Sequence, residues 1–484
     1  MSEALNAPTY RLSYHVIQIN SNDWMVFHPY SLSIFSLDSD EGRILKLYEE
    51  GFDEKIIAKK LKKPVDYVKW VIEDVHNNLI EKKPVGIVKA GEANMLWFLV
   101  AGSCNMSCSY CFASEGNYGD SYPALMDKHI ARKALDTLLD TFEIMYIYFF
   151  GGEPFLNFDT IKYIVEYASS KSNDVHFGVT TNATLLTREV VKFIKDYDIQ
   201  ITVSLDGPEL VHDYHRVTKN GEGTHQKVIK TIELLEKYDI KFPIEATYTR
   251  EAIELGFSLK DIVEYLSKFT NRVLFKPATS FELLEHRLAN RSDVLGHPRI
   301  YPLIEEYFAY IIDKLCTKEP IYDEVVMQGL YALVTKYLKQ HACPTLRYIS
   351  VYPNGDLYTC HLLKHKTCYM GQINNINGEE LMRNWRKVSE VVSKSVNIIP
   401  LLRKYWFCPF QSLCPAAGTT AHDSYPTIRF TRDFVPFSTF VWEVIVKNIV
   451  LCREDNKKWN TLVSNVKKFT KTAEEEKLQI VKYT

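Results

Sequence analysis

The sequence predicts an α/β protein: a parallel sheet with crossover helices, flanked by a small N-terminal unit and a cysteine-bearing C-terminal region. Two observations lead to this architecture. Strand-like apolar segments alternate with helical segments between residues 91 and 280, and cysteines gather at 104–111 and again from residue 343. The length of 484 residues suits about three domains, and a hydrophobic content of 46% allows a large core.

Residues 1–90 are expected to form a unit of their own. Two segments rich in β-branched and aromatic residues, 11–19 and 24–38, predict strands. Three later segments have apolar residues spaced three and four apart, as amphipathic helices do; they are 41–51, 53–61 and 65–80.

The central region, residues 91–280, alternates strand and helix. Near-continuous apolar segments are typical of strands buried on both faces, and the alternation predicts parallel strands joined by crossover helices. The six predicted strands are 95–102, 144–152, 175–182, 199–207, 244–249 and 272–278.

Three cysteines follow the first of these strands: Cys104, Cys108 and Cys111, in the stretch CNMSCSYC. Their thiolates suit three corners of an iron–sulfur cubane and leave the fourth iron open. The alternative is half of a zinc site or a group of buried thiols. Zinc motifs usually add a second pair of Cys or His, and none follows at the usual spacing.

The CxxxCxxC spacing, with Tyr110 before the last cysteine, resembles the cluster loop of the radical S-adenosylmethionine (SAM) enzymes. The resemblance implies a 4Fe–4S cluster whose open iron binds the amino and carboxylate groups of SAM, and whose electron releases a 5′-deoxyadenosyl radical. It also implies that the six strand–helix units form a partial β/α barrel, with the chemistry at the carboxyl ends of the strands.

The same resemblance assigns SAM contacts to the later strand ends. Gly151-Gly152-Glu153-Pro154 follows the second strand and is expected to bind the methionyl end of SAM, by close backbone approach and through the Glu153 carboxylate; without this context GGEP is an ordinary turn. Asp206 is equally consistent with a turn former before Gly-Pro. The other expected SAM-binding residues are Tyr110, Asn182, Ser204 and Arg216, whose guanidinium suits a carboxylate.

A second set of cysteines begins with Cys343 and Cys360, which lie on either side of Gly355 in the turn sequence YPNGDLY. This spacing resembles the opening of the SPASM or Twitch domain, which binds auxiliary iron–sulfur clusters. An Asn-Gly hairpin would fold these two thiolates toward each other. Cys408 and Cys414, in YWFCPFQSLCPAAG, match that domain's second half.

We expect one auxiliary 4Fe–4S cluster on Cys343, Cys360, Cys408 and Cys414. Tyr405 and Gly418 stand where the domain has two further cysteines, so the pairing stays open, and Cys368 or Cys452 is a candidate for an altered arrangement. A zinc ribbon is the alternative for the four cysteines. Cys316 is expected to be a core thiol, and His361 is as consistent with a structural residue as with an acid or base.

The expected boundaries divide the chain into five parts. Between the central region and the auxiliary-cluster domain, residues 281–342 are expected to form a helical bridge. The SPASM/Twitch-like domain is expected to span 343–452, and the Lys-rich tail, 453–484, to be a surface helix or partly loose.

The N-terminal unit, with strands followed by three short helices, resembles the winged-helix recognition element found beside enzymes that modify ribosomally made peptides. The resemblance implies a leader peptide that adds as a strand to the sheet edge. A DNA-binding winged helix is the competing interpretation, but the third helix carries Asp66, Glu73 and Asp74 against Lys69. A purely structural cap is a further alternative.

Charge and composition exclude several classes of partner. The formal net charge of −2 gives no electrostatic reason to expect nucleic acid. The N-terminal residues lack the basic-then-apolar pattern of a signal peptide, and no run approaches the roughly 18 apolar residues of a membrane span. We therefore expect a cytoplasmic protein without a membrane partner. Ten cysteines then indicate metal or redox chemistry rather than a disulfide framework.

These resemblances together imply a radical SAM maturase of a ribosomally synthesised precursor peptide, supplied with electrons by a flavodoxin or ferredoxin. The expected product is a thioether between a Cys sulfur and an unactivated carbon. Carbon–carbon cross-linking, epimerisation and formylglycine formation are alternatives with the same fold. A non-catalytic leader-binding protein and a zinc-binding regulator are alternatives from a different class.

Overall fold

The fold was established from a computed structural model. The structure describes residues 14–28, 32–80, 86–88, 93–111, 113–117, 124–172, 174–278, 281–282, 287–288, 294, 296–335, 337–339, 347–361, 368–396, 429–430 and 434–475. Cys343, Cys408 and Cys414, together with Tyr405 and Gly418, lie outside these residues.

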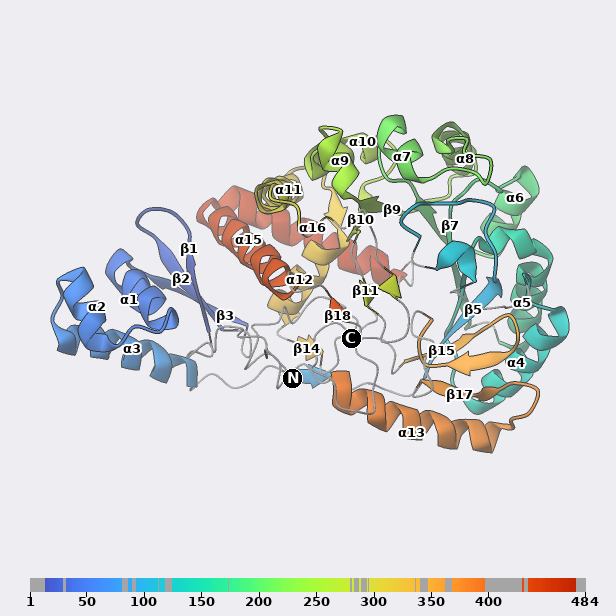
Figure 1. Ribbon diagram of the computed structural model, residues 1–484, viewed down its shortest axis with the longest axis horizontal. Helices are drawn as coiled ribbons and strands as arrows, with labels where there is room; N and C mark the ends of the chain where they lie inside the picture. Colours follow the sequence, from blue (N-terminus) through green and yellow to red (C-terminus); the bar gives the residue numbers. More distant parts are fainter. Residues whose placement is uncertain are drawn as a thin grey trace.

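A ten-stranded sheet forms the centre of the molecule, in the order β13-β10-β9-β8-β7-β6-β5-β15-β16-β17 (Figure 1). The strands from β13 to β15 pair in parallel, and the β15–β16 and β16–β17 pairs are antiparallel. All six predicted strands are present: β5 Met95–Ala101, β6 Tyr146–Gly151, β7 His176–Thr181, β8 Gln200–Ser204, β9 Ile244–Tyr248 and β10 Arg272–Pro277. The predicted α/β class with a parallel sheet is therefore confirmed.

Crossover helices connect these strands and lie on the outer side of the sheet (Figure 1). Their apolar residues recur every three or four positions and are buried, as in α4, where Ala131, Ala134, Leu135 and Leu138 face the core. The helices are α4 Lys128–Thr141, α5 Phe158–Lys171, α6 Arg188–Asp196, α7 Glu209–His215, α8 His225–Lys237, α9 Arg250–Glu254 and α10 Leu259–Leu266; two short 3₁₀ turns are η1 Ser114–Gly116 and η2 Pro154–Asn157.

The N-terminal unit is a three-stranded antiparallel sheet followed by three helices, as expected from the sequence. The segment predicted as one strand, 24–38, contains Pro29 and forms two strands, because proline has no N–H to donate to a ladder. The elements are β1 His15–Gln18, β2 Trp24–His28, β3 Ser33–Leu37, α1 Ser39–Glu49, α2 Glu54–Leu61 and α3 Val65–Ile80.

This small sheet buries both faces. Val16, Trp24 and Val26 pack with α1 to α3 in a separate small core, whereas Met25 and Phe27 join the main core. The alternation follows from the two-residue period of a strand. The unit is therefore packed against the rest of the chain.

The segment expected to be a helical bridge contains helices and also short strands. Helix α11, Ile300–Leu315, and helix α12, Glu324–Thr335, are present, but β13, Tyr322–Asp323, extends the central sheet beside β10. The apolar runs of the two helices dominate the sequence pattern, and a two-residue strand is too short to alter it. The remaining short strands are β4 Gly86–Val88, β11 Phe281–Glu282, β12 Arg287–Leu288, β14 Tyr337–Lys339 and β18 Arg429–Phe430.

The last helices complete the scaffold. Helix α15, Phe434–Glu454, packs on α11 and places Trp442 against Phe27 of the N-terminal unit, with ring centroids 5.9 Å apart (Figure 1). The expected tail helix is present as α16, Asn456–Glu475, but it is packed and not a surface appendage, because Leu462, Val466 and Phe469 share one buried face.

The auxiliary region is described only in part. A hairpin joins β15, Tyr348–Val351, to β16, Asp356–Tyr358, through the predicted Asn-Gly turn, where Gly355 has φ +88°. Strand β17, Tyr369–Gln372, and helix α13, Gly378–Val396, follow. The domain boundaries, the winged-helix assignment and the SPASM/Twitch assignment stay predictions.

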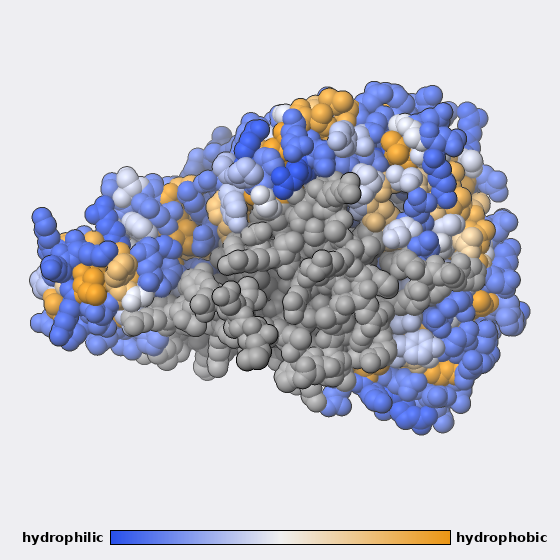
Figure 2. Space-filling view, viewed as in Figure 1, coloured by the Kyte–Doolittle hydropathy of each residue, from blue (hydrophilic) through white to orange (hydrophobic). Residues whose placement is uncertain are grey.

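Most of the described surface in Figure 2 is hydrophilic, with scattered hydrophobic residues. Among the described residues, no helix has both the length and the apolar composition that a bilayer crossing requires.

Candidate active site at the carboxyl ends of the strands

The cluster loop leaves β5 at its carboxyl end and carries Cys104, Cys108 and Cys111, all partly exposed. A turn closes the last two, since the Cys111 N–H donates to the Cys108 carbonyl at 3.0 Å. The Ser107 N–H donates to the Val217 carbonyl at 2.9 Å, which ties the loop to the segment after α7. The three thiols therefore lie on an anchored loop.

Nitrogen donors surround the sulfurs. Cys104 Sγ accepts from the Met106 N–H at 3.4 Å and from Asn182 Nδ2 at 3.8 Å, and Cys111 Sγ accepts from the Glu115 N–H at 3.4 Å. Such donors stabilise thiolates and tune the potential of an iron–sulfur cluster. Burial raises the pKa of the Cys104 thiol to about 11 and that of Cys108 to about 12, so a bound cation would be needed to ionise them.

Within the described residues, no three His, Cys, Asp or Glu side chains come together as a mononuclear metal site would require. A cubane binds each thiolate through a different iron. The half-zinc-site alternative for the loop stays open.

The two glycines of GGEP have a role that sequence reasoning did not assign. A Cβ on Gly151, at φ +132°, would lie 2.2 Å from the Ala101 carbonyl oxygen, and one on Gly152 would lie 2.1 Å from the Ser103 carbonyl oxygen. Neither position tolerates a side chain, because the backbone at the end of β6 meets the backbone at the end of β5 and the start of the cluster loop there. The expected close approach is thus made to the loop itself.

Glu153 is fully buried and joins two strand ends. Its carboxylate accepts from Thr181 Oγ1 at 2.7 Å, from the Asn182 N–H at 2.8 Å and from the Phe155 N–H at 3.2 Å. Burial raises the pKa of Glu153 to about 7 despite these donors. Oε2 accepts only the Asn182 bond among the described residues, so a carboxylate lone pair remains for another donor. Pro154 begins η2 directly after it.

Asn182 connects the second and third strand ends to the cysteines. Its Nδ2 donates to Asn105 Oδ1 at 2.9 Å as well as to Cys104 Sγ, and its Oδ1 accepts from Thr184 Oγ1 at 2.7 Å. The structure thus brings the predicted GGEP, Asn182 and cluster-loop residues together.

The fourth strand end is built around Asp206, which sequence reasoning left as a possible turn former. Arg216 Nε donates to Asp206 Oδ2 at 2.9 Å, and the Tyr110 hydroxyl donates to the same oxygen. Burial alone would raise the pKa of Asp206, but Arg216 outweighs it and holds the pKa below its ordinary value. Ser204, the last residue of β8, is buried nearby in the chain. Sequence spacing alone gave no signal for this pairing.

The strand registers place several polar and aromatic side chains on one face of the sheet, which we call the inner face: Trp97, Tyr148, Thr180, Glu245 and Lys276. The Tyr148 hydroxyl lies 3.1 Å from Thr180 Oγ1. A Cβ on Gly178 would lie 2.4 Å from the Tyr148 ring, so this glycine makes room for it.

Aromatic rings gather at one end of the inner face. The ring of His361, which follows β16, stacks on Trp97 with centroids 4.2 Å apart and planes 6° apart, and Phe150 meets it edge-on at 5.0 Å. Burial lowers the pKa of His361 to about 3. This histidine is therefore neutral near pH 7.

Charged groups gather at the other end. Desolvation acts to lower the pKa of Lys276, but the carboxylates of Glu245 and Glu324 outweigh it and raise the pKa. Lys276 also interacts with Tyr148, and its charge further lowers the pKa of His361. The inner face therefore brings groups from β10, β6 and the β16–β17 hairpin within electrostatic reach.

Of the predicted auxiliary ligands, only Cys360 is described. It is buried, and the residue before it, Thr359, donates its N–H to the carbonyl of buried Cys368 at 3.0 Å, which places both cysteines at the open end of the β16–β17 hairpin. Cys452 lies elsewhere, with its Sγ 2.7 Å from that of Cys316. Cys316 is partly exposed rather than fully buried. The auxiliary ligand set stays a prediction.

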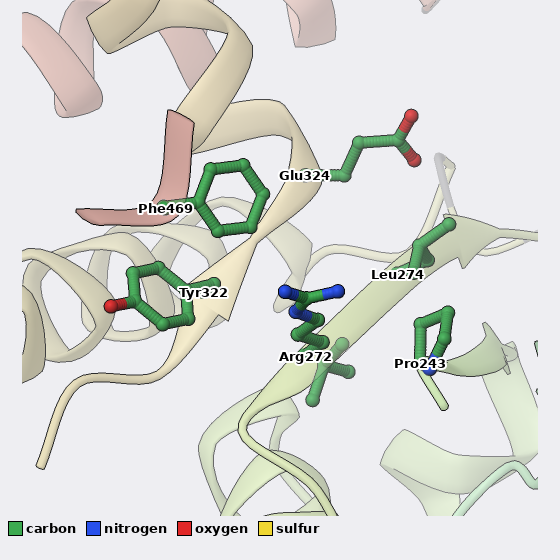
Figure 3. Close-up of a pocket in the computed structure, with 7 residues that line it drawn as sticks. Pro243, Arg272, Leu274, Tyr322, Glu324 and Phe469 are labelled. Atoms are coloured by element: carbon green, nitrogen blue, oxygen red, sulfur yellow. The ribbon is translucent and has the colours of Figure 1, made fainter. Parts of the chain in front are cut away.

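A pocket lies at the amino ends of the strands, whereas the cluster loop lies at their carboxyl ends (Figure 3). It is lined by residues at the amino ends of the strands, among them Pro243, Arg272 and Tyr322, and by Phe469 of α16. The cluster loop follows the carboxyl end of β5, so this pocket is not part of the site.

Comparison with known proteins identifies the family. Residues 99–267, which contain the cluster loop and the strand ends through β9, match the radical SAM superfamily. An uncharacterised protein of Methanocaldococcus jannaschii is 30% identical over 286 residues, which cover 57% of this chain and 88% of that protein. The chain belongs to the radical SAM superfamily. A radical SAM domain implies a 4Fe–4S cluster and SAM as cofactors.

Two relatives with named activities match part of this chain. The radical SAM cyclopropyl synthase of Paramaledivibacter caminithermalis is 22% identical over 205 residues, covering 39% of this chain and 42% of that protein. A cysteine-type anaerobic sulfatase-maturating enzyme of Clostridium perfringens is 27% identical over 156 residues, covering 31% of this chain and 42% of that protein. The chain thus spans less than half the length of each.

Solved structures share the fold of this radical SAM protein. Native anSMEcpe with bound AdoMet superposes with a TM-score of 0.59 and 17% identity, covering 74% of this chain and 99% of that one. The same protein with bound AdoMet and the Cp18Cys peptide gives a TM-score of 0.59 and 19% identity, covering 75% of this chain and 100% of that one. At these identities the likeness shows the fold alone.

Proposed function

We propose that this radical SAM enzyme is a peptide maturase that forms thioether cross-links, from a Cys sulfur to an unactivated carbon, in a ribosomally synthesised precursor peptide. The observation that carries the proposal is the cluster loop held against two other strand ends by Asn182 and the GGEP backbone. The name of one relative, the sulfatase-maturating enzyme of Clostridium perfringens, supports a protein or peptide substrate.

The cofactor assignments follow from the donors present. Cys104, Cys108 and Cys111 hold the 4Fe–4S cluster, which when reduced supplies a 5′-deoxyadenosyl radical from SAM. Gly151, Gly152, Glu153, Pro154, Asn182, Ser204, Arg216 and Tyr110 form the SAM site. Among the described residues, Arg216 donates only its Nε to Asp206, so its terminal N–H groups can bind a carboxylate. Glu153 Oε2 likewise accepts a single bond there, so it can accept from an ammonium.

The inner face is the proposed substrate site, at the concave side of a partial β/α barrel. Trp97, Phe150 and His361 offer an apolar wall for the side chain that loses hydrogen, and Glu245 with Lys276 offers polar contacts for the peptide backbone. Within the described residues, the buried Nδ1 of His361 has no hydrogen-bond partner, which suits a group that meets a substrate. Excluding water from this face protects a radical from side reactions.

The outer parts of the chain supply the remaining functions. The N-terminal unit recognises the leader peptide, with β3 as an edge strand of its sheet. Leader binding raises the effective concentration of each core residue at the inner face. An auxiliary cluster on Cys343, Cys360, Cys408 and Cys414 binds the substrate thiolate or accepts the surplus electron. A flavodoxin or ferredoxin reduces the enzyme in the cytoplasm.

The test uses the reconstituted enzyme with reductant, SAM and the Cys-containing peptide encoded beside its gene. The proposal expects each cross-link to remove two hydrogen atoms from the peptide mass, and fragmentation to place the link between sulfur and carbon. A peptide without its leader is expected to be modified far more slowly. An unchanged mass, with 5′-deoxyadenosine released, would overturn the cross-linking proposal.

Formylglycine formation is the second candidate, because the cysteine-type sulfatase-maturating enzyme of Clostridium perfringens is 27% identical over 156 residues of this chain. That reaction converts the CH2SH side chain of a cysteine to an aldehyde, CHO, so the peptide loses the sulfur and two hydrogens and gains an oxygen. The same mass measurement therefore separates the two products.

A further inference from the structure

Two cysteines away from the candidate site lie in contact. Cys316 caps the carboxyl end of α11, and Cys452 lies in the last turn of α15. Their Sγ atoms are 2.7 Å apart. The two helices are neighbours in the same helical layer (Figure 1), so a bond between the sulfurs needs only a small adjustment of the side chains.

The surroundings fix this corner of the molecule. Buried Asn465 of α16 donates its Nδ2 to the carbonyls of Leu315 and Thr317, at 2.9 Å and 2.8 Å, on either side of Cys316. Lys458 Nζ lies 2.8 Å from Asp313 Oδ1 and ties α16 to the last turn of α11. The contact between the thiols is thus held by a packed scaffold and does not depend on a free chain end.

The two thiols differ in accessibility. Cys316 is partly exposed, whereas Cys452 is only 6% exposed. A small reagent from solvent therefore reaches Cys316 first, and Cys452 is placed to attack whatever forms there. Burial raises the pKa of both Cys316 and Cys452, so little thiolate is present near neutral pH and the exchange is expected to be slow.

We propose that Cys316 and Cys452 form a reversible disulfide that staples α11 to α15. The oxidant is a low-molecular-weight disulfide. The thiolate of Cys316 attacks one of its sulfurs and releases one small thiol, and Cys452 then attacks the mixed disulfide and releases the second. Two protein thiols are oxidised, one small disulfide is reduced to two thiols, and the protons of the protein thiols pass to them.

The staple closes a long loop that contains every predicted auxiliary ligand, from Cys343 to Cys414. It also restrains α15, the helix that contacts the N-terminal unit through Trp442 and Phe27. A cross-link across a long loop removes many conformations of the unfolded chain. The disulfide is therefore expected to stabilise the C-terminal half of the chain against unfolding.

The experiment uses the full-length holoenzyme under anaerobic conditions, with glutathione disulfide as the probe. After incubation the protein is acid-quenched, alkylated in denaturant and mapped by mass spectrometry. The expected product is one peptide pair joined through Cys316 and Cys452, and its formation is expected to raise the apparent melting temperature. Dithiothreitol is expected to restore both.

Two single variants, Cys316→Ser and Cys452→Ser, serve as matched controls. Cys452→Ser is expected to stop at a glutathione adduct on Cys316, and Cys316→Ser to give far less adduct, because Cys452 is buried. The proposal is overturned if the folded wild-type enzyme forms no such pair while other cysteines react. It is also overturned if the pair forms only after the protein is unfolded in guanidinium. Both of these outcomes are measured on the wild-type enzyme, so they do not depend on the variants folding or on the enzyme being active.

Discussion

Asp206 and Arg216 form a buried ion pair at the carboxyl end of β8, with Arg216 Nε 2.9 Å from Asp206 Oδ2. The Asp206 side chain is 1% exposed and that of Arg216 is 11% exposed. The pair also fixes Tyr110 of the cluster loop, whose hydroxyl donates to Asp206. One carboxylate therefore positions two of the residues proposed to contact SAM.

Breaking this pair is expected to destabilise the protein strongly. Asp206→Asn leaves the Arg216 charge buried without its partner, which typically costs about 3 kcal/mol or more. Urea unfolding of the two proteins measures the loss. Asp239→Asn is the matched control, because Asp239 and Lys241 form an ion pair whose side chains are 80% and 81% exposed. This pair is expected to make no measurable contribution to the free energy of unfolding. Equal stability of Asp206→Asn and wild type would contradict the finding.

Gly152→Ala is expected to disturb the cluster loop. A Cβ there would lie 2.1 Å from the Ser103 carbonyl oxygen, and overpacking of this kind costs about 2 kcal/mol. We expect iron content after reconstitution to fall together with SAM cleavage. Gly221→Ala is the control: its φ of +82° makes alanine strained by about 1 kcal/mol, but no atom lies within 4 Å. Full iron loading of Gly152→Ala would show that the loop tolerates the displacement.

Lys276→Met tests the inner face. The change removes the ammonium that interacts with Glu245 and Glu324 and that we propose contacts the peptide backbone. A substrate that is misplaced for this reason typically reacts about 100-fold more slowly. We expect peptide modification to fall by this factor while SAM cleavage in the absence of peptide stays near wild type. Lys241→Met, at a side chain 81% exposed, is expected to leave both unchanged. A parallel loss of both activities in Lys276→Met would place Lys276 in radical formation instead.

Glu443 predicts a pH dependence for the contact between α15 and the N-terminal unit. Its pKa is raised from 4.5 to about 7, mainly by burial, with Lys46 opposing the shift and Glu49 adding to it; His15 Nδ1 lies 3.6 Å away. The folded protein then binds more protons than the unfolded chain between these values, so this group lowers stability as pH rises through them. Glu443→Gln is expected to remove that decline. The measurement is the difference in unfolding free energy between variant and wild type across this window, and a constant difference would refute the assignment.

The sequence predicted the elements of the central region well because each strand there is a short, nearly continuous apolar run. The strand-end residues were also found, because each comes directly after such a run. Asp206 was harder to assign, since Asp before Gly-Pro is a common turn sequence and its partner, Arg216, is ten residues later on another element. The inner-face groups Glu245 and Lys276 had no local signal, because only the register of parallel strands makes them neighbours.

We propose that Cys104, Cys108 and Cys111 initiate chemistry on a peptide. The most direct test measures 5′-deoxyadenosine formed from SAM by the reconstituted, reduced enzyme, with and without the precursor peptide. We expect formation of 5′-deoxyadenosine to increase with the peptide, to match the hydrogen lost from it, and to disappear in Cys108→Ala. An enzyme that carries its full iron complement and forms no 5′-deoxyadenosine under any of these conditions would contradict it.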